Sequence, residues 1–252
     1  MNRSLLSAIA LTTAIGLTAP VGAENPVHVK QLLETNQCPG CNLTNANLVN
    51  ADMNQADLTG ADFRGANLRG ATLRRANLKD ANLRNANLAE AKLSLADLLG
   101  VNFTNANLNA ANLSGTYLGG AQLNRANLSA ANLSNAHLEG VDMLGVDLSN
   151  ANLSNARLTG AYLPFANLSN SNLSYAKLDG SQLFYANLDS AELIGTRLNS
   201  ANLTEANLTD ANLREAVLTN ANLTGAELTN TNLNQTNLKG VTGLFSLQST
   251  SQ

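Results

Sequence analysis

The chain has 252 residues and a formal net charge of −3, from 15 Lys and Arg against 18 Asp and Glu, which argues against a strongly basic nucleic-acid binder and a strongly acidic mimic of nucleic acid. It has no Trp, four Tyr and five Phe. Together with an excess of Leu, Ala and Asn, this composition indicates a repetitive chain rather than an ordinary globular domain.

Residues 1–23 have the features of a signal peptide. Arg3 precedes an apolar run, and the small residues Val21-Gly22-Ala23 fit a cleavage site. The apolar run is too short to span a bilayer as a permanent helix, and no second such run follows. We therefore expect an exported protein without a membrane span.

Residues 24–40 are expected to cap the repeats that follow. Asn25 can act as the N-cap of a short helix, with Pro26 at its first position. The helix would cover the first repeats with an apolar stripe of Val29, Leu32 and Leu33.

The pair Cys38 and Cys41 has two interpretations. A Cys-x-x-Cys spacing occurs in thioredoxin-like redox enzymes, which supports a thiol-disulfide function. However, the pair follows the predicted helix instead of opening one, and no βαβ pattern surrounds it. In an oxidising compartment we favour a structural disulfide that fixes the cap to the first coil.

Residues 41–240 repeat with a period of five and no slip of register. Every position numbered in 3 or 8 is Leu, Met or Phe, and a small residue, usually Ala, stands two places earlier. A period of five fits neither a helix face nor a flat strand, so the chain must turn every five residues. Ala and Leu then point inward, and the next two residues form a corner.

The number of corners in one coil is indicated by the glycines. Thirteen of the forty corner positions are Gly, and seven of these fall among the ten corners that repeat every twenty residues from Gly60 to Gly240. A period of twenty predicts four faces per coil and about ten coils. It also suggests that one corner in four needs the positive φ or the close approach that Gly allows. Residues 241–252 are expected to form a C-terminal cap and tail, with Leu244, Phe245 and Leu247 over the last coil.

Repeats such as Ala46-Asn47-Leu48 and Ala61-Asp62-Phe63 resemble the A(D/N)LXX pattern of the pentapeptide-repeat family. The resemblance covers about four fifths of the chain. It implies an all-β fold, a right-handed quadrilateral parallel β-helix, with the central residue and the one two before it inside. Exceptions in the Asn/Asp position are expected to change the surface and not the fold: Thr72, Lys92, Tyr117, Arg157 and Val217.

No residue pattern indicates catalysis, a metal or a cofactor. A coil filled by Leu and Ala leaves no cavity for a site. His28 and His137 are the only histidines, and neither adjoins a nucleophile motif. We therefore expect a protein that is not an enzyme.

Two surface features carry what functional signal there is. Residues twenty apart should stack on successive coils, which places His137, Arg157, Lys177 and Arg197 in one column. Such a column either faces an anionic partner or is neutralised locally by Glu139 and Asp179. The second feature is an outward apolar group that is a candidate contact surface for a protein: Leu144, Tyr162, Pro164, Phe165, Phe184 and Tyr185.

The favoured function is a structural or protein-interaction rod with an unidentified protein partner and no nucleic acid. End-to-end or side-by-side self-association of the rod stays open. The resemblance implies a location in the periplasm or the thylakoid lumen, because the capping helix and Cys-x-x-Cys are similar to those of exported cyanobacterial members. The main alternative is the gyrase inhibition by DNA mimicry of the family's quinolone-resistance members, and a redox function of the cysteines is a third possibility.

Overall fold

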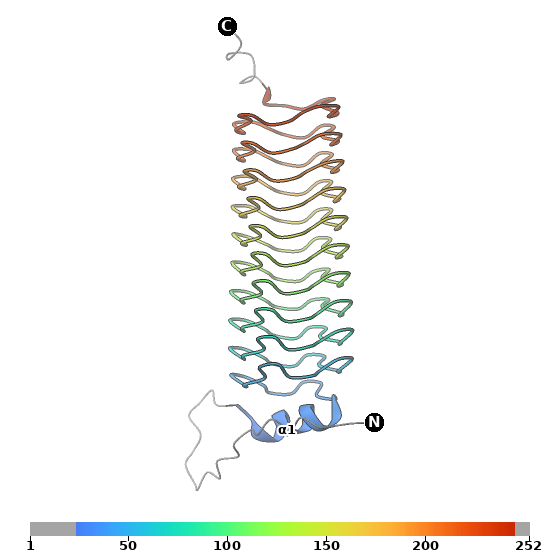
Figure 1. Cartoon of the computed structure of the whole chain (residues 1–252), viewed down its shortest axis with the longest axis vertical. Coiled ribbons are helices and arrows are strands. Elements are labelled where there is room, and N and C mark those ends of the chain that lie inside the picture. The colour runs from blue at the N-terminus through green and yellow to red at the C-terminus, as the bar shows by residue number, and fades with distance from the viewer. Residues whose placement is uncertain (1–23, 245–252) are drawn as a thin grey trace.

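The computed structural model describes residues 24–244 and consists of a short helix, α1 (Pro26–Thr35), followed by a column of stacked coils (Figure 1). The signal peptide expected at 1–23 lies outside the described residues, as do Phe245 and Leu247. Helix α1 lies across one end of the column, and the chain leaves the column at the other end (Figure 1).

Each five-residue unit contributes one residue to a parallel bridge with the residue twenty places later. The bridges run without a break from Gln37 paired with Asp57 to Asn222 paired with Thr242. Within a bridge such as Asp147 with Asn167, the amide of Leu148 donates to the carbonyl of Asn167 at 2.7 Å. One coil therefore takes four units, as the period of twenty predicts.

The inside of the column is apolar and closed. Both the Ala and the central Leu of almost every unit are buried, and together they form one continuous core along the column. Polar residues in the Ala position keep their hydroxyl groups bonded to main-chain carbonyls, as Thr116 does to Leu113 at 2.7 Å and Ser171 to Leu168 at 2.6 Å. Within the described part of the chain, no buried hydroxyl of this kind is left free as a nucleophile.

The prediction that one corner in four often needs the positive φ that Gly allows is too narrow, because all four corners need it. Every corner from Asn45 to Gly240 has a positive φ, between 54° at Asp210 and 72° at Gly240, whatever residue occupies it. Close approach explains only part of the glycine column, since a Cβ on Gly100 or Gly240 would meet the side chain one coil below, whereas one on any of the other five would meet nothing within 4 Å. All four corners need the left-handed conformation, which Gly and Asn adopt at the lowest cost.

The bridges continue through exceptions such as Lys92 and Arg157, so these residues leave the fold unchanged, but the Asn/Asp position does more than face outward. In most units its Oδ1 accepts the amide of the residue two places later, as Asp147 does from Ser149 at 3.0 Å. Asn side chains also bond from coil to coil, as when Asn187 Nδ2 donates to Asn167 Oδ1 at 3.4 Å. Most exceptions therefore lose a cap on a turn amide, although the amide that follows Thr72, that of Arg74, donates to Asn54 Oδ1 at 3.0 Å instead.

The two ends of the column differ. Asn25 caps α1 by accepting from the amides of Val27 and His28, and Leu32 is fully buried in the core. Val29 packs partly buried against the same core, but Leu33 is 40% exposed, so it does not belong to the covering stripe that the sequence predicts. At the other end the inward residues of the last coil are only partly buried, and Leu244 packs against them.

Candidate functional site

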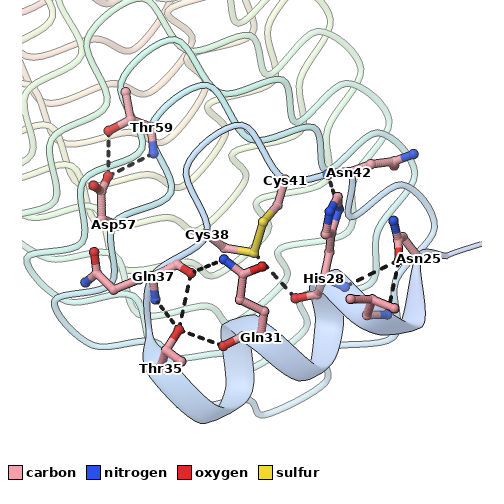
Figure 2. The surroundings of a disulfide bond; sticks show 11 residues. Asn25, His28, Gln31, Thr35, Gln37, Cys38, Cys41, Asn42, Asp57 and Thr59 are labelled. Atoms are coloured by element: carbon pink, nitrogen blue, oxygen red, sulfur yellow. Dashed lines mark hydrogen bonds between the residues drawn. A yellow bond between two sulfur atoms is a disulfide. The ribbon is translucent and has the colours of Figure 1, made fainter.

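Cys38 and Cys41 form a disulfide where α1 meets the first coil (Figure 2). Both residues are buried, at 0% and 4% exposure, within the apolar core. A reactive cysteine needs access and an electropositive environment, such as a helix N-terminus, whereas this pair follows the C-terminal end of α1. Burial therefore favours the structural interpretation over the redox one.

Hydrogen bonds also tie α1 to the first coil (Figure 2). His28 Nδ1 accepts the amide of Asn42 at 3.0 Å, and Gln31 Nε2 donates to the carbonyl of Gln37 at 2.9 Å. The sequence offered no signal for these bonds. They assign His28 a structural contact and leave it no catalytic partner among the described residues.

The predicted apolar group forms a cluster of rings on one corner of two neighbouring coils, which we call the aromatic corner. Phe165 stacks on Tyr185 with ring centroids 5.2 Å apart and planes 6° from parallel. Phe184 meets Phe165, Tyr185 and Tyr162 edge to face at about 6 Å. Tyr162, Phe165 and Tyr185 remain 41%, 57% and 54% exposed.

Two members of the predicted group contribute less surface than expected. Pro164 is buried, and Leu144 is only partly exposed. Pro164 occupies a turn position. In most units, the amide at this position donates to the side chain of an Asn or Asp, but proline has no N–H to donate. This explains how Tyr162 can replace Asn in that unit without leaving a turn amide unpaired.

The backbone under the aromatic corner is of a kind that bulky residues rarely adopt. Phe165 and Tyr185 have φ values of 57° and 58°, and Asn105 and Gly145 occupy the same corner on other coils. Bulky residues in this region cost of order 1–2 kcal/mol more than Gly or Asn. The rings therefore stand where the fold alone favours small or polar residues.

The predicted cation column is present, and we call it the cation column throughout: His137, Arg157, Lys177 and Arg197 bridge in succession. Local neutralisation covers only its ends. His137 lies 3.8 Å from Glu139, and Arg197 Nε lies 3.2 Å from Asp179 Oδ2. Arg157 and Lys177 are exposed, and their side chains have no hydrogen bond or ion pair to any described residue.

The remaining described surface offers no catalytic or metal-binding arrangement. No group of three or more His, Cys, Asp or Glu side chains in residues 24–244 could hold a metal ion. An open depression of about 370 Å³ is lined by Asn, Gln, Arg, Ser and Leu side chains without an acid-base pair. No helix among the described residues is long and apolar enough to cross a membrane.

Sequence reasoning missed a row of main-chain amides beside the cation column. The four cations, with Tyr117 before them and Val217 after them, stand in the Asn/Asp position, so the amides two residues later have no cap and no other hydrogen bond to a described residue: Gly119, Glu139, Thr159, Asp179, Asn199 and Thr219. On the other three faces, turn amides that lack any hydrogen bond never occur on two successive coils among the described repeats. The run of non-Asn residues from Tyr117 to Val217 was the available signal.

The chain is similar to several solved structures. HetL of the cyanobacterium Nostoc sp. strain PCC 7120, involved in heterocyst differentiation regulation, is 32% identical over 87% of this chain and 96% of its own, with a TM-score of 0.40. QnrB1, a plasmid-mediated fluoroquinolone resistance protein, is 23% identical over 64% of this chain and 81% of its own, with a TM-score of 0.59.

A third similar structure is a protein of the Arabidopsis thaliana thylakoid lumen, 34% identical over 42% of this chain and 74% of its own, with a TM-score of 0.40. No match was found among curated proteins. The family model "Pentapeptide repeats" matches the segments 38–75, 76–115, 106–143, 126–163, 161–199 and 201–240. This coverage, with a bridge every twenty residues, shows that the chain belongs to the pentapeptide-repeat family.

Proposed function

We propose that the protein is an exported, non-enzymatic rod that binds a protein partner through the aromatic corner. The exposed, mutually packed rings of Phe165, Tyr185 and Tyr162 carry the proposal. Clustered exposed aromatics are typical of protein contact surfaces, where they supply large apolar area at low entropic cost. The partner that fits is a protein with an apolar recess for these rings.

The backbone supports this assignment independently. Phe165 and Tyr185 occupy left-handed corners at a conformational cost that the fold does not require, since other coils place Gly or Asn there. The buried, satisfied interior supports a rod that acts through its outer faces rather than as an enzyme.

The proposed organisation of the chain follows from the sequence. Residues 1–23 are the signal peptide, 24–40 the capping helix with its disulfide, 41–240 a right-handed β-helix of about ten coils, and 241–252 the C-terminal cap and tail. The lumenal Arabidopsis protein and the apolar N-terminal run support export to the periplasm or thylakoid lumen.

The charge distribution does not support a DNA mimic of the kind that inhibits gyrase. Such a mimic needs a strongly acidic face, whereas this rod has a net charge near zero and a column with two unpaired cations. The 23% identity to QnrB1 concerns the fold alone.

The test is a pull-down from periplasmic or lumenal extract with two baits, the wild type and Phe165→Ser combined with Phe184→Ser. We expect a specific partner that the double variant loses while its thermal unfolding stays close to wild type. A matched control, Leu95→Ser, removes an exposed apolar side chain from a different corner and should keep the partner. Equal capture by all three baits would contradict the proposal.

A further inference from the structure

A row of unpaired main-chain amides lies along one face of the rod. The N–H groups of Glu139, Thr159, Asp179 and Asn199 recur one per coil, about 4.8 Å apart. Unpaired donors of this kind require an oxygen acceptor from outside the chain, either water or a ligand. The face therefore has several regularly spaced donors for oxygen.

The other faces show which chemical group fits this donor. In most units there, the equivalent amide donates to a carboxylate or carboxamide oxygen of its own chain, as Ser149 does to Asp147 at 3.0 Å and Arg64 to Asp62 at 3.1 Å. A carboxylate supplied by a ligand would occupy the same position on the cation face.

Positive charge coincides with the free donors at the middle of the row. Arg157 and Lys177 stand on adjacent coils beside the amides of Thr159 and Asp179, and neither cation has an ion pair within residues 24–244. Elsewhere several cations are paired, including Arg64 with Asp62 at 2.7 Å. The carboxylates nearest in sequence to the column, Glu139 and Asp179, contact His137 and Arg197, which leaves Arg157 and Lys177 for a ligand.

The neighbouring corner leaves room for a ligand chain. Gly140, Gly160 and Gly180 follow one another on that corner, and a Cβ on any of them would meet nothing within 4 Å. A segment lying along the column would therefore meet no side chain at the glycine position of this corner over three coils.

We propose that this face binds an acidic peptide segment, with Arg157 and Lys177 pairing with its carboxylates while the amides of Thr159 and Asp179 donate to their oxygens. The inference deepens the proposed function and rests on it, because it names the chemistry of a protein partner. Nucleic acid fits less well, since two free cations neutralise few phosphates.

The test measures binding of a fluorescent twelve-residue Asp/Glu-rich peptide by anisotropy at low salt. Arg157→Asn with Lys177→Asn removes both charges and gives each turn amide an internal cap, so the variant moves toward the repeat pattern and should fold. We expect its affinity to fall about tenfold or more. Lys92→Asn is the matched control, because it makes the same change on another face, and it should bind like wild type.

A further variant, Arg157→Gln with Lys177→Gln, removes the charges but leaves the amides uncapped, and it should bind between the wild type and the Asn variant. Three results would overturn the inference: equal binding by the Asn variant and wild type, equal binding of an Asn/Gln peptide, or tighter binding of single-stranded DNA. Capture of a partner through the aromatic corner without peptide binding would contradict this inference and leave the proposed function intact. Peptide binding without any captured partner would instead count against the proposed function.

Discussion

Replacement of Asn187 by Ala tests the role assigned to the Asn position. Asn187 Oδ1 accepts the amide of Asp189 at 3.1 Å and Nδ2 of Asn207 at 3.2 Å, while its own Nδ2 donates to Asn167 at 3.4 Å. The cap contributes about 1 kcal/mol and the two part-buried ladder bonds about 0.5 kcal/mol each, so we expect a loss of about 2 kcal/mol.

Guanidinium unfolding would measure this loss as a lower midpoint, and amide exchange would show faster exchange at Asp189. The opposite change, Arg157→Asn, adds a cap for Thr159 and should raise the free energy of unfolding by about 1 kcal/mol, with a higher midpoint. The assigned role of the Asn side chain would be refuted by either of two results: an Asn187→Ala variant as stable as the wild type, or an Arg157→Asn variant less stable than it.

Three further predictions concern the core, the disulfide and one turn carboxylate. Leu153→Ala should lower the stability by about 3 kcal/mol in guanidinium unfolding, because Leu153 is fully buried and its removal leaves a cavity; a loss below about 1 kcal/mol would contradict a closed core. Cys38→Ser with Cys41→Ser should cost about 2 kcal/mol, the loop entropy of a four-residue closure, and dithiothreitol should destabilise the wild type alone in thermal unfolding. Donors from the Thr59 hydroxyl and amide lower the pKa of Asp57 below its ordinary value of 3.8. The stabilisation from ionised Asp57 is therefore fully present above pH 3.8 and is lost as the pH falls through the lowered pKa. Thr59→Val should raise the pKa of Asp57 in an NMR titration, and an unchanged pKa would contradict the assignment of the shift to Thr59.

The fold was predictable because the packing repeats strictly. A Leu at every fifth position, with Ala two places before it, requires a turn in each unit, and the core contains these residues from Leu43 to Leu228. The reason for the glycines was not predictable, since all four corners share one backbone conformation. Composition alone does not reveal that Asn, Asp and even Phe165 adopt it.

The candidate surfaces were predictable only as columns. Spacing by twenty residues brought Arg157 and Lys177 together, and it grouped Phe165 with Tyr185. The uncapped amides were not predicted because the sequence indicates only that the Asn position faces outward. The hydrogen bond between the Asn side chain and the turn amide is visible only in the structure. Pro164 was misjudged for a similar reason, because its missing N–H, and not its apolar surface, suits that position.

Site-specific photocrosslinking in intact cells of the source organism tests the aromatic corner most directly. A photoreactive phenylalanine at Tyr185 would be compared with one at Asn105, which occupies the same corner four coils earlier. We expect one discrete protein adduct from position 185 and none from position 105. Equal adducts at both positions, or none at position 185, would contradict a protein contact at the aromatic corner.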